Sequence, residues 1–471
     1  MSRCVRVACC LLLVAAMSSL AAAGEASDRA ASHVGIVVPA GGDWKQFAGR
    51  AVHHNHAVAE GAFTQQTVGR LHEAWRTTFG TSASSTGGAA VAAGQAFIGG
   101  ADGVLSAFSL QACATGSCTP LWRGVTKNGI HGTPAIVTDG LVLVGSADHF
   151  LYAFHTDGCG RRTCPPVWRG KLQDSALASV AVFRGRAYIG DAGGHVYAFH
   201  AHGCGHPVCQ PLWTGIAGPN LQFNTIPAVA DGHVFIGAFF NTPDDASGRL
   251  FSFATLGCGK ATCRPEWRAD MRGQVDGTLS PLVLGDTVFM GSGTRFSNVP
   301  NGPVHLFAFD VAGCGKRFCH PVRSYRTGDA DLTGGLAVAN GVIYAGSQST
   351  PDPNTIGVFM AFPADGCGAA VCDPLWTAVN FASGFESPPV VSGDVVFVAK
   401  GPASGFPVDQ AVLSYPADGC GQPTCTWLSF TSLGDQQFYL GSPIAVARHT
   451  VFVPTEASAD GTDDLVALTV E

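Results

Sequence analysis

Residues 132–168 read GTPAIVTDGLVLVGSADHFLYAFHTDGCGRRTCPPVW, and this stretch decides the fold. It contains short apolar runs rich in Val, Leu, Ile, Phe and Tyr, and Gly, Asp or Pro separates each run from the next. Runs of this kind are typical of β-strands joined by tight turns. We therefore predict four consecutive strands, A to D, within 132–140, 141–146, 150–154 and 158–168.

This unit recurs along the chain, and cysteines mark its period. An aromatic residue also returns at one position of strand C, where we expect it to pack between neighbouring sheets. The cysteine pairs start 45 to 56 residues apart, which is the period of a four-stranded propeller blade. The pairs are Cys113/Cys118, Cys159/Cys164, Cys204/Cys209, Cys258/Cys263, Cys314/Cys319, Cys367/Cys372 and Cys420/Cys425. The strand-C aromatics are Phe108, Phe154, Phe199, Phe253, Phe309, Phe362 and Tyr415.

An eighth unit, at 441–446, 451–453 and 465–470, has no cysteines and ends before a strand D. The segment 69–75 carries a Trp of the strand-D kind, Trp75, yet it precedes the first strand A. Pairing this segment with the last unit closes a ring and leaves no free sheet edge. The sequence therefore predicts an all-β, eight-bladed β-propeller of four-stranded antiparallel blades over 68–471, closed by an N-terminal strand that completes the last blade.

The beginning of the chain predicts export. Arg3 and Arg6 precede an apolar run at 9–17, and Ala21, Ala22 and Ala23 form a small-residue cleavage site. We predict a signal peptide at 1–23 and a lead-in segment at 24–67; the alternative is an uncleaved membrane anchor. No other apolar run is long enough to span a bilayer, so we expect a secreted or periplasmic protein without membrane insertion.

The composition and net charge of the chain indicate which partners it does not attract. Of 471 residues, 46% are hydrophobic, only 13% are charged and 61 are Gly, which suits many short strands. Loss of Arg3 and Arg6 would leave 25 of the 27 basic residues against 34 acidic ones, a net charge of −9. We therefore expect no nucleic-acid partner.

Removing the signal peptide also leaves 14 of the 17 cysteines, an even number for an oxidising compartment. Each pair flanks four residues at the turn between strands C and D, where antiparallel geometry permits a disulfide. Such a bridge stabilises by roughly 2 kcal/mol through the unfolded chain, and we expect its benefit to be local, in fixing each turn. Metal or redox chemistry would favour Cys-x-x-Cys spacing or histidine partners, so we predict seven structural disulfides.

The recurring strand-C Ala, hairpin Gly and strand-D Trp resemble the repeat of the pyrroloquinoline quinone (PQQ) propeller superfamily. The segment 43–49, DWKQFAG, resembles the lead-in that precedes the first blade in that group. The resemblance covers nearly the whole mature chain and implies the propeller fold. It implies two kinds of function, because the superfamily contains quinoprotein dehydrogenases and non-catalytic outer-membrane assembly lipoproteins.

For a dehydrogenase, the resemblance implies a quinone held between a Trp and a ring of two adjacent disulfide-linked cysteines, with calcium bound by Glu, Asn and Asp. The only adjacent cysteines, Cys9 and Cys10, lie in the predicted signal peptide, and no haem-attachment sequence is present. In that group an Asp often follows the strand-C Ala and aromatic residue, and in this chain only Asp310 stands at that position. Every Trp has a scaffold position: Trp44 in the lead-in, Trp75, Trp122, Trp168, Trp213, Trp267 and Trp376 in strand D, and Trp427 close to strand D of blade seven.

Polar residues just ahead of strand A are the candidate ligand-binding residues, because they line the mouth of the channel. The Asn, the two Asp and the Glu among them could bind calcium, with His131 as a base; the alternative, which we favour, is that these polar residues simply line a hydrated channel. The candidates are His131, Asn224, Asp276, Asp331, Glu386 and Tyr439, beside Ser85, Thr86 and Thr278.

The loops between strands B and C emerge on the face that carries the channel-mouth residues. They are short in blades one to three and long in blades four to eight, at 239–248, 293–302, 349–356, 401–409 and 456–464. Long irregular loops on a rigid scaffold often carry recognition. We therefore expect a secreted, monomeric, non-catalytic scaffold that binds a protein or a polar small molecule there. The alternative is a PQQ- and calcium-dependent dehydrogenase acting on an alcohol or sugar.

The segment 52–56, VHHNH, places three histidines within four residues. Such a group can chelate a metal, but no fourth ligand lies nearby in the sequence. We predict an exposed lead-in segment and no metal site.

Overall fold

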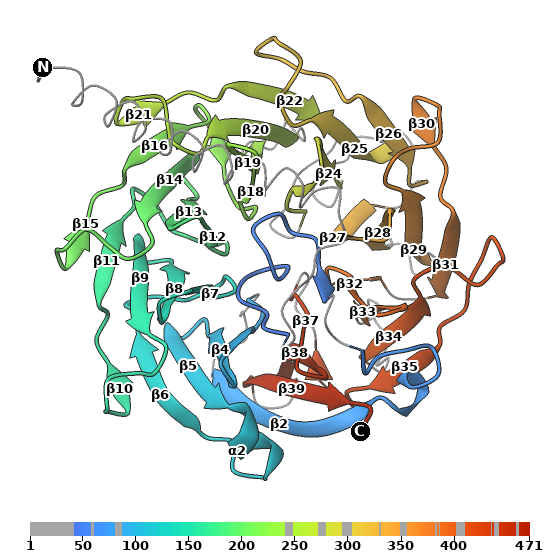
Figure 1. Ribbon diagram of the computed structural model, residues 1–471, viewed down its shortest axis with the longest axis horizontal. Coiled ribbons are helices and arrows are strands. Elements are labelled where there is room, and N and C mark those ends of the chain that lie inside the picture. The colour runs from blue at the N-terminus through green and yellow to red at the C-terminus, as the bar shows by residue number, and fades with distance from the viewer. Residues whose placement is uncertain are drawn as a thin grey trace, which may run out of the picture. The chain divides into compact units, whose positions relative to one another are not determined.

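Eight β-sheets are arranged around one axis in the unit formed by Gly41–Glu471, which confirms the predicted eight-bladed propeller (Figure 1). The structure is a computed structural model, which describes residues 42–57, 61–80, 87–240, 248–271, 279–293, 304–328, 331–348, 356–381, 384–385, 387–401, 410–434, 436–437, 442–457 and 461–471. The predicted signal peptide lies outside these residues. Among them, no helix is long and apolar enough to cross a membrane.

Each blade is an antiparallel sheet whose strand A lies nearest the axis and whose strand D lies at the rim. Blade one consists of β3 (Ala90–Ala92), β4 (Gln95–Gly99), β5 (Val104–Ser109) and β6 (Pro120–Val125). Blade two consists of β7 (Ala135–Val137), β8 (Leu141–Ser146), β9 (Phe150–His155) and β11 (Trp168–Lys171). Blade three consists of β12 (Ala181–Phe183), β13 (Arg186–Gly190), β14 (His195–His200) and β16 (Trp213–Ile216). Blade four consists of β18 (Ala228–Ala230), β19 (His233–Phe240), β20 (Gly248–Ala254) and β22 (Trp267–Met271).

The remaining blades follow the same order around the ring. Blade five consists of β23 (Leu282–Leu284), β24 (Thr287–Gly291), β25 (Val304–Asp310) and β26 (Arg323–Arg326). Blade six consists of β27 (Asp331–Ala339), β28 (Val342–Gln348), β29 (Ile356–Pro363) and β31 (Trp376–Phe381). Blade seven consists of β32 (Val390–Ser392), β33 (Val395–Lys400), β34 (Ala411–Pro416) and β35 (Ser429–Ser432). Blade eight consists of β37 (Ala445–Ala447), β38 (Thr450–Ala457), β39 (Asp463–Thr469) and β2 (His72–Gly80).

Strand β2 closes the ring, as the unpaired strand-D sequence predicted. It runs antiparallel to β39, with His72 opposite Thr469 and Trp75 opposite Ala467. The last blade therefore takes three strands from the end of the chain and one from its beginning, and this pairing covers the edge that β39 would otherwise expose.

The core lies between neighbouring blades, and the predicted strand-C aromatics fill it. All seven are fully buried, with exposed fractions of 1% or less. The ring of Phe154 in blade two lies against Gly124 in strand D of blade one, where a Cβ would come within 2.7 Å of it. The same pairing joins Phe199 to Gly170. A glycine two residues after the strand-D Trp thus makes room for the aromatic ring of the next blade.

The cysteine hairpins do more than fix their own turns, which is the only role that we predicted for them. In most blades the second half of the hairpin reaches back and pairs, in parallel, with strand D of the preceding blade. These short strands are β10 (Thr163–Cys164) on β6, β15 (Val208–Cys209) on β11, β21 (Thr262–Cys263) on β16 and β30 (Val371–Cys372) on β26. Single bridges, Arg268 to Phe318 and Thr377 to Thr424, do the same on β22 and β31. Several sheets therefore have five strands rather than the predicted four.

All seven predicted disulfides are present. In six of them the Cα atoms of the two cysteines are 5.6 to 5.7 Å apart, across a hairpin of the predicted kind. In the first pair this distance is 3.9 Å. The bonds are Cys113–Cys118, Cys159–Cys164, Cys204–Cys209, Cys258–Cys263, Cys314–Cys319, Cys367–Cys372 and Cys420–Cys425.

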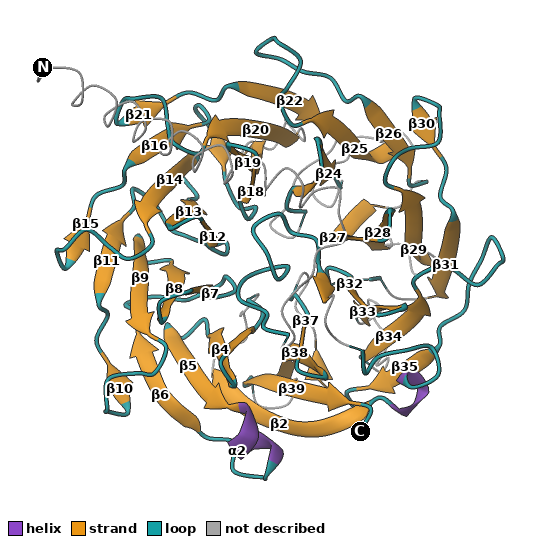
Figure 2. Cartoon of the chain, in the orientation of Figure 1, coloured by secondary structure: helices purple, strands orange, loops and turns teal. Residues whose placement is uncertain are grey.

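The first pair corrects the prediction that every disulfide spans a simple turn between strands C and D. Cys113 lies in a short helix, α2 (Leu110–Ala114), whose N-cap Ser109 accepts a hydrogen bond from the backbone N–H of Ala112 (Figure 2). Cys118 follows this helix and precedes β6. Blade one differs because Ala112 and Ala114 flank Cys113, whereas Gly stands on both sides of the first cysteine in the other six pairs.

Three second cysteines lie outside the strands, and their backbones also correct the purely local role that we predicted. The amide of Cys319 donates to the carbonyl of Arg268 in blade four at 2.9 Å, and the amide of Cys425 donates to that of Thr377 in blade six at 2.7 Å. The carbonyl of Cys118 accepts from the hydroxyl of Thr77 in β2 of blade eight, 2.9 Å away. These three disulfides therefore hold backbone groups that bond to the preceding blade.

The lead-in continues from the axis to the rim beside blade seven. A 3₁₀ helix, η1 (Val68–Arg70), precedes β2 and lies beside β35. The hydroxyl of Thr431 in β35 donates to the carbonyl of Leu71, 3.3 Å away. This segment occupies the edge of blade seven, since blade eight has no cysteine hairpin to reach back.

Candidate functional site

The lead-in segment lies at the centre of the ring, where it bonds to the innermost strands (Figure 1). The backbone carbonyls of Trp44 and Lys45 accept from the amides of Val91 in blade one and Ile136 in blade two, both at 2.7 Å. Ala51 and Val52 accept in the same way from blades four and five, and His54 and Asn55 from blades six and seven. One amide of strand A in each of these blades therefore bonds to the lead-in.

Blades three and eight are reached through side chains. The amide of Gln46 bonds to the backbone of Val182 in blade three. Asp43 forms an ion pair with Arg448, which follows strand A of blade eight, at 3.2 Å. Residues 43–55 thus meet the blades in the order eight, one, two, three, four, five, six and seven. This segment makes one circuit of the channel, and we call it the central segment.

A short strand follows the central segment. β1 (His56–Ala57) pairs in parallel with β32 of blade seven, with His56 opposite Val391. Farther on, Gln65 donates from its backbone to Asp394 and from its side chain to Asp418, both at 3.1 Å. Asp394 lies in the turn between strands A and B, and Asp418 in the turn after strand C. The lead-in therefore leaves the ring on the face that carries the C-to-D hairpins.

The three histidines of 52–56 are not exposed, which corrects the sequence prediction. His53 is 3% exposed, and its ring Nδ1 donates to the carbonyl of Pro281 at 2.7 Å. His54 donates from Nε2 to the carbonyl of Val283, also at 2.7 Å. These bonds direct the two rings at separate carbonyls of blade five. Among the described residues, no group of three or more metal-ligating side chains comes together.

Burial decides the charge of these histidines. Desolvation lowers the pKa of His53 to about 4, against a smaller opposing effect of its hydrogen bond to Pro281. Desolvation also lowers the pKa of His56 to about 4, with the charges of His54 and Arg50 acting in the same direction. The pKa of His54 is lowered for the same main reason. At neutral pH the bonds of His53 and His54 to blade five are therefore made by neutral imidazoles.

Of the six candidate residues at the channel mouth, two have described side chains. His131 lies between β6 and β7, and its Nε2 lies 2.6 Å from the point where a Cβ on Gly129 would stand. Asn224 lies between β17 (Leu221–Gln222) and β18, in blade four. The two therefore lie on blades that are not neighbours.

Asn224 carries the polar atom that bears most directly on ligand binding. Its Oδ1 is buried and has no hydrogen-bond partner among the described residues. Asp331 is the first residue of β27, where its backbone pairs with Gln348. Asp276, Glu386 and Tyr439 lie outside the described residues, as do Ser85, Thr86 and Thr278.

The face with the B-to-C connections differs from blade to blade. These connections are short in blades one to three, at 100–103, 147–149 and 191–194, and longer in blades four to seven, at 241–247, 292–303, 349–355 and 401–410. In blades four, six and eight, strand B also pairs with a piece of the D-to-A connection: β17 with β19, the first residues of β27 with β28, and β36 (Gln436–Gln437) with β38. In blade seven a single bridge joins Phe385 of this connection to Lys400 of β33. Within the described residues, four of the eight blades are thus built up on this face.

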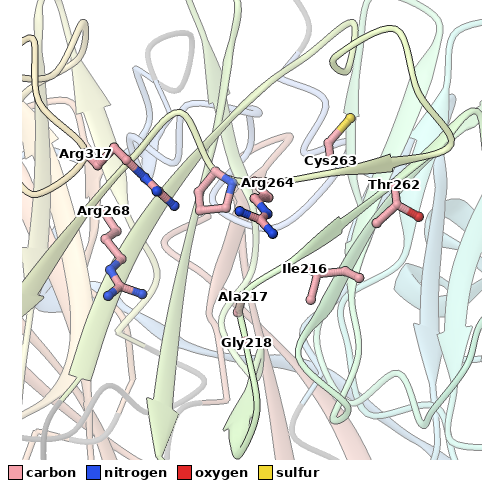
Figure 3. A pocket seen from close by; sticks show the side chains of 9 residues that line it. Ile216, Ala217, Gly218, Thr262, Cys263, Arg264, Arg268 and Arg317 are labelled. Carbon is pink, nitrogen blue, oxygen red and sulfur yellow. The ribbon is translucent and has the colours of Figure 1, made fainter.

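Pockets formed by described residues lie between neighbouring blades. One, of about 610 Å³, lies where blade eight meets blade one and is lined by Trp75, Leu110, Leu121 and Phe452 among others. Another, of about 430 Å³, lies where blade three meets blade four and is lined by three arginines (Figure 3). Neither pocket includes a candidate residue of the channel mouth.

The residues that would hold a quinone in the related dehydrogenases have other positions here. Trp44 is buried in the central segment, bridged to Val91, and Trp122 donates from its indole N–H to the carbonyl of Thr156 in the next blade. Every described cysteine belongs to a disulfide at the rim. The described residues therefore do not fit a quinone held between a Trp and a ring of adjacent cysteines.

Comparison with known proteins agrees with this architecture. A family model described as outer membrane protein assembly factor BamB matches residues 159–412, more than half of the chain. Among curated protein sequences, none matches significantly.

Solved structures match over most of the chain. BamB from Moraxella catarrhalis is 16% identical, with a TM-score of 0.54, covering 85% of this chain and 97% of its own. Quinohemoprotein alcohol dehydrogenase from Comamonas testosteroni is 12% identical, with a TM-score of 0.58, covering 94% and 84%. The computationally designed protein Ika8 is 14% identical, with a TM-score of 0.57, covering 84% and 99%. At these identities the likeness shows the fold alone.

Proposed function

The chain belongs to the family of the outer membrane protein assembly factor BamB, and we propose that it is a non-catalytic scaffold that binds other proteins outside the cytoplasm. The binding surface is the face of the B-to-C connections. The seven disulfides support a non-cytoplasmic site of action, because such bonds persist in oxidising compartments. Because the family is described as an outer membrane protein assembly factor, we seek the partner among the proteins of that process.

The unequal use of the two faces carries this proposal. On the hairpin face, each cysteine hairpin after the first lies against the preceding blade, so its backbone groups are already used within the ring. On the other face, blades four to eight carry added chain and added strand pairs that the propeller itself does not require. Loops of this kind on a rigid scaffold are where binding residues concentrate.

The placement of Trp and Cys supports the scaffold over the dehydrogenase. A quinone needs flat, rigid surfaces on both sides, and the residues that supply them in the related enzymes here hold blades together or close hairpins. His131 and Glu386 are the residues on which a dehydrogenase site would depend. Asn224 Oδ1 is buried without a partner among the described residues, and it would equally suit a bound water, a cation or a partner's N–H group.

Photocrosslinking in the native host tests the binding face. A photoreactive residue is placed in the connection 292–303, in 401–410 and, as a control, at exposed Lys316 in a hairpin of the opposite face. We expect both connections, and not Lys316, to crosslink to the same protein. Crosslinks from Lys316 alone would place the binding surface on the other face and overturn the proposal.

A loop graft then measures what the face contributes. Replacing 401–410 by the short connection 147–149 of blade two keeps a turn that this scaffold already uses. We expect the protein identified by crosslinking to co-purify at least about tenfold less, with an unchanged melting temperature. Undiminished co-purification would contradict the proposal.

The dehydrogenase is tested separately. The mature protein is reconstituted with PQQ and calcium, and dye reduction is followed with a panel of alcohols and sugars. We expect no turnover above that of free PQQ. Turnover that disappears in His131→Ala and Glu386→Gln would show that the chain is an enzyme.

A further inference from the structure

Three arginines line a pocket between blades three and four. The pocket is formed by the end of strand D in blade three, at 216–218, by the hairpin of blade four, at 262–265, and by Arg268 and Arg317. Figure 3 shows the side chain of Arg317 extending toward that of Arg264, with Arg268 beneath Arg317. Arg264 follows the hairpin of blade four, Arg268 lies in strand D of that blade, and Arg317 comes from the hairpin of blade five, which lies against that strand.

Within the described part of the chain, no carboxylate pairs with Arg264, Arg268 or Arg317, and no acidic residue lines the pocket. Arg268 stacks on Phe318, with its guanidinium carbon 4.3 Å from the ring centroid, and its Nε is buried without a hydrogen-bond partner among the described residues. The neighbouring Arg249 shows the usual arrangement, since it pairs with Asp270.

Neighbouring positive charges act on Arg268. Burial lowers the pKa of Arg268, and the positive charges of Arg249 and Arg317 lower it further, with Asp270 opposing. The whole chain carries a net charge of −7, so a three-arginine cluster without an acidic partner in the described structure contrasts with the rest of the protein. Unpaired like charges at close range repel one another, and a bound anion removes that repulsion.

The repeat supplies an internal comparison. The amide of Arg268 donates to the carbonyl of Arg317, at 2.9 Å, and the amide of Thr214 donates in the same way to Ala261 one blade earlier. The corresponding positions around the ring can therefore be read directly. Each set consists of the residue after the second cysteine, the residue after the strand-D Trp position and the third hairpin residue of the next blade. In that order, the sets are Thr119/Arg123/Arg162, Pro165/Arg169/Pro207, Gln210/Thr214/Ala261, Arg264/Arg268/Arg317, His320/Ser324/Ala370 and Asp373/Thr377/Pro423. Only blade four has arginine at all three, so the scaffold does not require this cluster.

We propose that the pocket between blades three and four binds a phosphate group through Arg264, Arg268 and Arg317. Guanidinium groups present planar pairs of N–H donors that match phosphate oxygens. A phosphate has three free oxygens and up to two negative charges, which suits three arginines better than a single carboxylate does. Ile216 and Pro265 form an apolar wall beside the cluster, and an organic group attached to the phosphate can lie against it.

Calorimetric titration of the mature chain with inorganic phosphate at low ionic strength tests this site. The test variant is Arg264→Gln/Arg268→Thr/Arg317→Ala, which installs the side chains that blade three carries at the same positions. The control is Arg123→Thr/Arg161→Ala/Arg162→Ala, which removes three positive charges at the rim between blades one and two. We expect the test variant to weaken binding at least about tenfold and the control to leave it within about twofold, with unchanged melting temperatures in both.

A second arm identifies the source of the phosphate. Vesicles of phosphatidylcholine with and without phosphatidic acid are titrated with the same three proteins. Binding to phosphatidic acid that the test variant loses and the control keeps indicates a phosphate carried on an amphiphile, whereas binding of inorganic phosphate alone indicates a soluble ligand. No saturable binding in either arm, or equal loss in the control, overturns the proposal. None of these outcomes bears on the protein-binding face.

Discussion

The side-chain amide of Gln46 hydrogen-bonds to both backbone groups of Val182: its Oε1 accepts from the amide at 2.8 Å and its Nε2 donates to the carbonyl at 3.3 Å. A single side chain thus completes the inner edge of blade three, where blades one, two and four to seven meet the backbone of the central segment. Strand A is the innermost strand of each blade, so the backbone groups on its axis-facing edge would otherwise remain unpaired. The central segment pairs with one amide of strand A in six blades and with both backbone groups of Val182 in blade three.

Gln46→Ala should therefore destabilise the protein although no apolar core residue is lost. Leaving the amide and carbonyl of Val182 without partners costs about 1 to 3 kcal/mol in the free energy of unfolding. Lys45→Ala is the matched control, because Lys45 bonds to blade two through its backbone and its side chain is exposed. Urea unfolding of both variants checks this, and equal stability of the two would show that the bonds to Val182 contribute nothing.

The buried histidines predict a loss of stability in acid. The folded pKa of His53 is about 4, below the 6.5 of the unfolded chain, so the unfolded state binds more protons between these values. The contribution of His53 to the free energy of unfolding is complete above about pH 6.5. It falls by up to about 1.4 kcal/mol per pH unit as the pH is lowered, and it levels off below about pH 4. His53→Gln keeps a donor for Pro281 and should flatten this fall.

Urea unfolding at a series of pH values between 7.5 and 4.5 measures the slope. Gln46→Ala is the control, since it weakens the same segment without removing a titrating group and should keep the wild-type slope. An unchanged slope in His53→Gln would mean that His53 takes up a proton while folded.

The two glycines around each hairpin cysteine should differ in their tolerance of a side chain. Gly158 and Gly160 both have positive φ, 76° and 72°, so alanine strains the backbone at either position. Only at Gly158 would the new Cβ also collide, at 2.7 Å from the indole of Trp122 in the preceding blade. Gly158→Ala should cost about 1 to 3 kcal/mol more than Gly160→Ala, as measured by thermal unfolding. Equal costs would show that backbone strain alone decides.

Removing one disulfide should loosen a contact between two blades. Cys258→Ser/Cys263→Ser is expected to cost about 2 kcal/mol. The amide of Thr214 in blade three, which donates to Ala261 of this hairpin at 2.8 Å, should exchange with deuterium faster. Cys367→Ser/Cys372→Ser should leave exchange at Thr214 unchanged. Faster exchange confined to the hairpin itself would limit the disulfide to local stabilisation.

Side-chain patterns predicted the ring well. Seven cysteine pairs, the recurring strand-C aromatics and the unpaired strand around Trp75 led to eight blades, seven disulfides and the closing pair of β2 and β39. These features depend on burial and spacing, which a sequence displays directly. The helix between Ser109 and Cys118 was missed, although Ala112 and Ala114 in place of glycine were a visible signal.

Backbone contacts were not predictable in the same way. The central segment bonds to strand A largely through its carbonyls, and a carbonyl is the same in every residue. The contacts that Cys319 and Cys425 make with the preceding blades use backbone amides, which are equally uniform. Only the pairing of their side chains within each hairpin was visible in the sequence.

Burial of polar side chains was also missed. The polar sequence around His53 and Asn55 indicated exposure, yet both side chains are buried because carbonyls of blades five and six accept their hydrogen bonds. The candidate residues at the channel mouth remain a prediction, apart from the positions of His131 and Asn224.

The circuit made by residues 43–55 also bears on how many blades this protein can have. The segment is synthesised before any blade, and the blades that follow bond to it in their order of synthesis, from Trp44 with blade one to Asn55 with blade seven. A ring that gained or lost one repeat would leave the later bonds out of step, because each carbonyl would face the wrong neighbour. The length of the N-terminal segment is therefore matched to eight blades. Duplication or deletion of a whole blade requires a matching change in this segment.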